Sequence, residues 1–353
     1  MLNSRKSPKR NGFTLIELMV AMTITTLIVS VLVSITSIAL DTWTRSRAEV
    51  RASRQAKAMV DEMAGDFESM ITRGGNNFQW LLAKYSAKGV GTETLESSNA
   101  SDLMFFTAAT DRYEGDLSNI NSLGDVSCVA YQLKYQDPIQ GEEASKGDNN
   151  AFSTFVLYRS IVDPDDTFRD LLGSDDLERS FARYLKQRSD VKNFLCENVY
   201  QYTITFQVEV VEVASDGRTT SQFGRVSLGT SKQGVREFRI FGDNIEILGG
   251  MGAGSGRGDR SRARPTGTRV PTNMDRPASS RNSRTSASRK GSEFTARDLE
   301  KGRVTAVEIS LTVLTDYAID QMRTRQFNSE EAKAEFIGKN SYQYSKVVEL
   351  PKK

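Results

Sequence analysis

The stretch FTLIELMVAMTITTLIVSVLVSITSIAL, residues 13–40, contains a single ionisable side chain, Glu17, among 28 residues. As a helix it would be about 42 Å long, which exceeds the ~30 Å hydrocarbon core of a bilayer. The run is longer than the apolar core of a secretory signal, and no small-residue cleavage site follows it. Residues 13–40 are therefore predicted to form one helix that stays in a membrane.

Basic residues precede this segment: residues 1–12 carry Arg5, Lys6, Lys9 and Arg10 and no acid. Positively charged flanks of membrane helices tend to remain in the cytoplasm. The N-terminus is therefore predicted to be cytoplasmic, and the chain after the helix is predicted to lie across the membrane.

Apolar residues recur at spacings of three and four after the membrane segment, which is typical of an amphipathic helix: Ala56, Val60, Met63, Phe67 and Met70. Polar residues are expected to fill the opposite face: Arg54, Lys57, Asp61, Glu62, Asp66 and Glu68. Gly74 and Gly75 are expected to end the helix. We predict a single helix, in lipid over residues 13–40 and packed on a domain over residues 41–73.

Beyond residue 100 the apolar period changes to two, which predicts half-buried antiparallel strands. Alternation is clearest over residues 202–210 and 307–313, and further strands are expected at 103–109, 128–135, 153–161, 235–241 and 344–350. Short helices are expected near Asp175 and after Asn328, each with a glutamate at capping-box spacing, Glu178 and Glu331. The fold class is therefore predicted to be α+β, a long transmembrane helix packed on an antiparallel β-sheet head over residues 74–353.

Charge is segregated along the chain. The net charge of +2 combines +4 in residues 1–12 with +8 in residues 249–292, which leaves −10 for the rest. Residues 249–292 are rich in glycine, serine and arginine with almost no large apolar side chains, so they are predicted to be a disordered insertion in the head. Their arginines suit either polyanion binding or contact with the acidic body. Their glycines lack the G-x-G-x-x-G spacing of a nucleotide loop, and the Arg257-Gly258-Asp259 tripeptide is attributed to composition.

Composition also restricts catalytic and cofactor chemistry. The chain has no histidine, which excludes a Ser-His-Asp triad, an imidazole base and a histidine zinc site. The acidic string DPDDTFRDLLGSDDLE, residues 163–178, lacks the order of a calcium loop and is better explained by helix caps. No enzyme activity, cofactor or small-molecule substrate is therefore expected.

Two cysteines, Cys128 and Cys196, allow one disulfide at most. Both stand in strand-like sequences, so the alternative interpretation is two small buried apolar side chains. An oxidising compartment would favour the disulfide.

Glu17 needs an explanation because a charged carboxylate in a membrane helix costs on the order of 3 kcal/mol. The sequence Lys-Arg-Asn-Gly-Phe-Thr-Leu-Ile-Glu, residues 9–17, resembles the signal peptide of type IV prepilins and type II secretion pseudopilins. The resemblance implies that prepilin peptidase cuts after Gly12 and methylates the new amine of Phe13. Glu17 would then be the fifth mature residue, which in such filaments is thought to pair with the N-terminal ammonium of a neighbouring subunit.

The rest of the chain is similar to the minor pseudopilin of the J type. The resemblance is carried by Val129-Ala130-Tyr131-Gln132-Leu133, Leu157-Tyr158-Arg159, and the apolar patterns at 195–206 and 307–311. The insertion at 249–292 departs from it. The resemblance implies a structural subunit of a type II secretion pseudopilus or a type IV pilus tip, in the bacterial inner membrane with its head in the periplasm. Its partners would be prepilin peptidase and other pilin-like subunits.

Two other functions stay open at this point. A signal-anchored periplasmic binding protein would use the same helix but needs neither Gly12 nor Glu17. A minor pilin of a DNA-uptake pilus would keep the fold and use the arginine-rich insertion.

Overall fold

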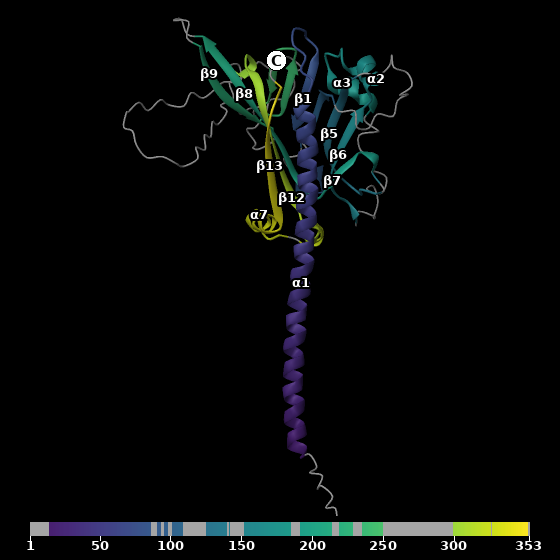
Figure 1. Cartoon of the computed structure of the whole chain (residues 1–353), viewed down its shortest axis with the longest axis vertical. Coiled ribbons are helices and arrows are strands. Elements are labelled where there is room, and N and C mark those ends of the chain that lie inside the picture. The colour runs from purple at the N-terminus through teal and green to yellow at the C-terminus, as the bar shows by residue number, and fades with distance from the viewer. Residues whose placement is uncertain are drawn as a thin grey trace, which may run out of the picture. The chain divides into compact units, whose positions relative to one another are not determined.

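The computed structural model describes residues 14–85, 90–92, 95–97, 101–108, 125–139, 141, 152–184, 191–213, 219–228, 235–249, 299–325 and 327–351. Contacts divide the chain into two compact units, Met1–Arg51 and Ala52–Lys353. One long helix, α1 (Leu15–Glu68, 54 residues), contributes to both units (Figure 1).

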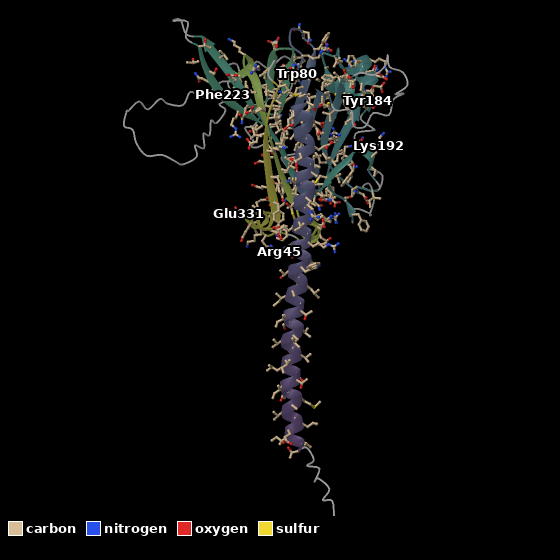
Figure 2. The ribbon with its side chains drawn as sticks, viewed as in Figure 1. Arg45, Trp80, Tyr184, Lys192, Phe223 and Glu331 are labelled. Atoms are coloured by element: carbon tan, nitrogen blue, oxygen red, sulfur yellow. The ribbon has the colours of Figure 1, made fainter. Side chains whose placement is uncertain are left out.

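In the first unit, the described residues form the N-terminal part of α1, and its large apolar side chains are exposed (Figure 2). The most apolar window of 18 residues has a mean hydropathy of 2.4 and is 0% buried. Hydroxyl groups along it donate to the carbonyl four residues earlier, for example Thr25 to Ala21 at 2.7 Å and Thr36 to Leu32 at 2.8 Å. Such bonds satisfy hydroxyl groups without water. In the part of the chain that the structure describes, α1 is the one helix long and apolar enough to cross a membrane.

The second unit contains two antiparallel sheets (Figure 1). The seven-stranded sheet has the order β11 (Asn244–Leu248), β10 (Glu237–Phe241), β1 (Gln79–Tyr85), β4 (Ser101–Thr107), β5 (Ser127–Gln136), β6 (Thr154–Val162) and β7 (Phe194–Glu197). The four-stranded sheet has the order β13 (Ser341–Glu349), β12 (Arg303–Leu314), β8 (Val199–Val213) and β9 (Thr219–Ser227). A small separate pair consists of β2 (Val90–Gly91) and β3 (Glu96–Ser97).

Short helices connect the strands. Between β6 and β7 lie α2 (Pro164–Asp166), the π-turn η3 (Thr167–Leu171), α3 (Leu177–Phe181), and the 3₁₀ turns η4 (Ala182–Tyr184) and η5 (Val191–Asn193). Between β12 and β13 lie α6 (Asp316–Thr324) and α7 (Glu330–Lys339). The caps of α3 and α7 are Asp176 and Ser329, each one residue after the position expected from the sequence. Glu178 binds Lys84 of β1 at 2.7 Å instead of completing a capping box.

The C-terminal part of α1 packs against both sheets of the second unit (Figure 1). Phe67 stacks on Phe105 of β4 with ring centroids 4.5 Å apart, and Asp61 binds Lys346 of β13 at 2.9 Å. Full burial of a side chain such as Phe67 contributes about 1.5–3 kcal/mol to stability. The buried residues recur at helical spacing and form one face of the helix: Ala52, Ala56, Met59, Val60, Met63, Ala64, Asp66 and Phe67.

The predicted α+β class is confirmed, and the seven predicted strand segments correspond to β4, β5, β6, β8, β10, β12 and β13. Strands β1, β9 and β11 and helix α6 were not predicted. The sequence feature that could have predicted β11 is Gly242, which lies in the hairpin turn between β10 and β11 and has a φ of 55°. A Cβ there would lie 1.8 Å from the carbonyl oxygen of Asn76, so this turn requires glycine.

Helix α1 ends at Glu68 and not at the Gly74-Gly75 pair. Beyond it the backbone pairs with β4 and the residue after it, because the amide of Ile71 donates to the Phe106 carbonyl at 2.9 Å and that of Ala108 to the Ser69 carbonyl at 3.0 Å. Met70, predicted to continue the helical stripe, is buried in this pairing. Contact with a distant strand therefore ends the helix.

Cys128 and Cys196 are both buried, and neither is part of a disulfide in the structure. Cys128 on β5 pairs with Val162 of β6, whereas Cys196 on β7 pairs with Leu157 from the other side of β6. Two strand spacings, about 10 Å, therefore separate the cysteines across the sheet, and the offset of five residues between their partners on β6 separates them further along it. A disulfide spans at most ~7 Å between Cα atoms. The fold contradicts a Cys128–Cys196 disulfide and places both residues as small buried side chains.

Both thiols should be unreactive in the folded protein. Burial, and then the charge of Glu197, raise the pKa of Cys196 to about 12, so its reactive thiolate is scarce at neutral pH. Maleimide labelling followed by mass spectrometry should leave the native chain unmodified and add two labels after unfolding without reductant. An unfolded chain that takes up no label would instead contain a disulfide.

Candidate functional site

Glu17 lies in the first turn of α1, where it forms a capping box with Thr14. The amide and hydroxyl of Thr14 each donate to Oε2 of Glu17 at 2.9 Å, and the amide of Glu17 donates to the Thr14 hydroxyl at 3.3 Å. Such a box satisfies amide groups that the start of a helix leaves without partners. It also holds the carboxylate at the positive end of the helix dipole.

The capping role of Glu17 was missed at the sequence level, although T-x-x-E at residues 14–17 has the required spacing. The two predicted processing residues, Gly12 and Phe13, lie outside the described residues. Thr14 draws the carboxylate toward the N-terminal end of the helix. A cut after Gly12 would create an ammonium group at this same end.

A second constellation, which we call the Asp66 cluster, attaches α1 to the seven-stranded sheet. It consists of Asp66 and Glu62 of α1, Tyr131 of β5 and Arg159 of β6. Arg159 donates through Nε and Nη2 to the two oxygens of Asp66, at 2.8 and 2.7 Å. Its Nη1 lies 3.1 Å from Oε1 of Glu62, and the hydroxyl of Tyr131 donates to Asp66.

The centre of the Asp66 cluster is excluded from water, since the side chains of Arg159 and Asp66 are 1% and 3% exposed. Burial raises the pKa of Tyr131 well above its usual value of 10, and the charge of Asp66 raises it further, so the hydroxyl stays a donor. A bidentate pair with an added hydrogen bond can offset the desolvation of both charges. The cluster therefore fixes one rotation of α1 on the sheet.

Asp66 was assigned to the exposed polar face of the helix, and that assignment is wrong. Its partner Arg159 stands 93 residues further along the chain, where no local pattern reveals it. Tyr131 and Arg159 belong to the segments 129–133 and 157–159, which were singled out in the sequence. The structure brings both of them onto a single helix carboxylate.

A family model described as the prokaryotic N-terminal methylation motif matches residues 7–33. The chain carries this motif. It includes Gly12, Phe13 and Glu17, and it indicates a subunit of the type IV pilin or pseudopilin kind, which prepilin peptidase processes and which assembles with other pilin subunits. With the apolar helix α1, it is compatible with a single-pass anchor in the inner membrane. Comparison with curated proteins and with solved structures found no match.

The acidic string at residues 163–178 is engaged within the fold. Arg169 lies 3.2 Å from Asp170, Arg183 lies 3.3 Å from it, and the hydroxyl of Tyr184 donates to it at 2.8 Å. The Tyr184 hydrogen bond and then Arg169 hold the pKa of Asp170 below its usual value. Within the described ranges, no group of three or more acidic or cysteine side chains is arranged to hold a metal ion.

Residues 250–298, most of the predicted polyanion-binding insertion, lie outside the described ranges.

Proposed function

We propose that the chain is a minor pilin-like subunit of a type II secretion pseudopilus or of a type IV pilus tip, with a structural role. The observation that carries the proposal is the methylation motif at residues 7–33, in which Glu17 stands five residues after Gly12. A membrane anchor alone would need neither residue. The absence of histidine from the sequence also makes an enzymatic role less favoured.

Within this class, the J-type minor pseudopilin of a secretion system is the subunit we favour. Two segments of the head are similar to that type, and each supplies one residue, Tyr131 or Arg159, that contacts Asp66. A subunit built on a spine helix needs that helix fixed on its head. The choice therefore depends on the sequence resemblance, and the contacts with Asp66 are compatible with it.

The placement in the cell follows from the charge of the leader. Residues 1–12, with four basic side chains, would stay in the cytoplasm until cleavage. Residues 13–40 would span the inner membrane, and residues 41–73 with the head over 74–353 would lie in the periplasm. Other pilin-like subunits would meet the chain there and within the membrane.

Assembly would depend on a charge pair in lipid. The ammonium of a neighbouring subunit's Phe13 and the carboxylate of Glu17 are each costly alone in the hydrocarbon region, so their pairing favours one axial register. Methylation leaves the amine able to carry a proton. Thr14 binds Oε2 of Glu17, and a carboxylate has acceptor capacity for further donors.

Processing is the direct test. Protein isolated from membranes of a host that contains prepilin peptidase should begin at Phe13 with a methylated amine, as measured by mass spectrometry of the N-terminal peptide. A Gly12→Leu variant is the control and should retain residues 1–12. Recovery of uncut wild-type protein in an assembled filament would rule out the proposed function.

A further inference from the structure

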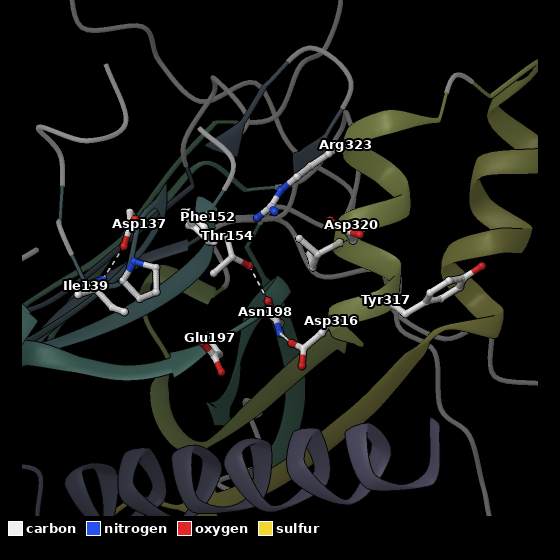
Figure 3. Close-up of a pocket in the computed structure, with 12 residues that line it drawn as sticks. Asp137, Ile139, Phe152, Thr154, Glu197, Asn198, Asp316, Tyr317, Asp320 and Arg323 are labelled. Carbon is white, nitrogen blue, oxygen red and sulfur yellow. Dashed lines mark hydrogen bonds between the residues drawn. The ribbon is translucent and has the colours of Figure 1, made fainter. Parts of the chain in front are cut away.

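The head contains a cleft of about 680 Å³ where the ends of three strands meet helix α6 (Figure 3). Residues of the turn after β5, the start of β6, the junction of β7 with β8, and α6 line it. A cleft of this volume is large enough to receive several side chains of a peptide. Nothing in the proposed subunit role uses it.

Carboxylates dominate the charge of this cleft. Asp137, Glu197, Asp316 and Asp320 line it, against one cationic side chain, Arg323. Arg323 donates through Nη2 to the carbonyl of Ser153, which ties it to the chain beside the cleft. Among the described lining residues, four carboxylates stand against one guanidinium, a formal charge of −3, which suits a cationic occupant.

The rim adds apolar and aromatic surface. Phe152 and Tyr317 are 76% and 60% exposed, although both are large rings. Exposed rings beside carboxylates favour a guanidinium group, because it can stack on a ring and bind a carboxylate through its planar fork. Arginine matches this lining better than a metal ion does.

The wall of the cleft is held in place by a chain of hydrogen bonds at the junction of the two sheets (Figure 3). Thr154 donates to Oδ1 of Asn198 at 2.5 Å, and Nδ2 of Asn198 donates to Asp316 at 2.5 Å. Asn198 has a φ of 62°, a conformation that non-glycine residues adopt rarely and that this network supports. The carboxylate of Asp316 is therefore pre-positioned, which reduces the entropy lost on binding.

The chain itself supplies a matching cation. Residues 257–290 carry nine arginines and one lysine against two aspartates. The other strongly acidic part of the head, residues 163–178, already directs Asp166 and Asp170 to Arg169. The cleft combines its carboxylates with exposed rings, which suits arginine side chains.

Residues 250–298 are also long enough to reach the cleft. The segment between Gly249 and Leu299 contains 49 residues. Strand β12, which follows it and leads to α6, would extend about 40 Å over its 12 residues. Half of the segment can reach roughly 80 Å when extended, about twice that distance.

We propose that the arginine-rich segment 250–298 docks in cis into the acidic cleft formed by Asp137, Glu197, Asp316 and Asp320. The bound segment would cover the rim formed by Phe152 and Tyr317. Docking does not require membership of a filament, so this inference stands apart from the proposed subunit role.

Trypsin cleavage of the full chain in detergent tests the docking, because trypsin cuts after arginine and lysine. Asp316→Asn with Asp320→Asn keeps the acceptor for Asn198 and removes two charges from the cleft. We expect cleavage within residues 257–290 to become roughly fivefold faster, because exposed ion pairs such as those lost here are individually weak. The matched control, Asp165→Asn with Asp175→Asn, removes two exposed charges elsewhere and should cleave like the wild type.

Equal cleavage rates in the cleft variant and the control would overturn the proposal. Wild-type protection that increases with protein concentration would overturn docking in cis and indicate a second copy as the occupant. The rate of cleavage in the head reports on folding in the same digest. A cleft variant cut faster only within residues 257–290 therefore supports the proposal.

Discussion

Replacing Asp66 with leucine should destabilise the second unit by about 3–5 kcal/mol, because it leaves the guanidinium of Arg159 buried without its main counter-charge. Asp66 accepts two hydrogen bonds from Arg159 and one from Tyr131, and its own side chain is 3% exposed. For a unit of this size the loss corresponds to a fall in melting temperature of roughly 10 °C. Thermal unfolding of the full chain in detergent, followed by circular dichroism, would measure it.

Two variants make this prediction specific to the buried pair. Asp66→Leu with Arg159→Met removes both charges and should recover most of the stability, since a buried ion pair replaced by apolar groups is often neutral. Glu62→Gln, at the 43% exposed partner of the same arginine, should cost less than about 1 kcal/mol. If Asp66→Leu unfolds within a few degrees of the wild type, the cluster does not hold α1 on the sheet.

The parts of the fold that were predictable depend on local pattern. A run of 28 residues with one charge identifies the first helix, and alternation with period two identifies β8 and β12. The burial of one face of a helix or strand produces a periodic pattern of apolar residues, which can be seen in the local sequence. The elements that could be predicted were therefore those with a clear local pattern of apolar residues.

Features that depend on distant partners were not predictable in the same way. The end of α1 at Glu68 is set by pairing of Ile71 with Phe106, and the burial of Asp66 is set by Arg159. In both cases the partner is far along the chain, so helical spacing alone placed the residue wrongly. Helix α6 was missed although Thr315 caps it, because its run of nine residues has a short apolar face.

The same distinction between local and distant partners applies to the candidate functional residues. Glu17 could be singled out because a lone charge in an apolar run is conspicuous, and its capping partner Thr14 is three residues away. The acidic cleft could not be predicted, since its carboxylates come from the turn after β5, from β7 and from α6, and they meet only in the folded head. Local motifs are visible in a sequence, and assembled surfaces are not.

Replacing Glu17 with leucine should reduce incorporation into filaments by roughly tenfold or more, because a neighbouring ammonium would lose its counter-charge in lipid. Insertion into the membrane should improve slightly, since leucine is more apolar. Cleavage after Gly12 should continue. Glu17→Gln should be intermediate, because the amide oxygen can still accept a hydrogen bond without carrying charge. Co-purification of each variant with co-expressed pilin-like subunits would measure the effect.

The capping box gives this experiment its control. Thr14→Val removes the hydroxyl that binds Glu17 but keeps the carboxylate, so it should cost about 1 kcal/mol of local helix stability. Incorporation of Thr14→Val should stay within about threefold of the wild type if Glu17 acts through a neighbouring subunit. If Thr14→Val and Glu17→Leu lose incorporation equally, then capping of α1 explains the need for the glutamate. Wild-type incorporation of Glu17→Leu would mean that the head alone drives assembly, because no charge pair would then be needed in the membrane.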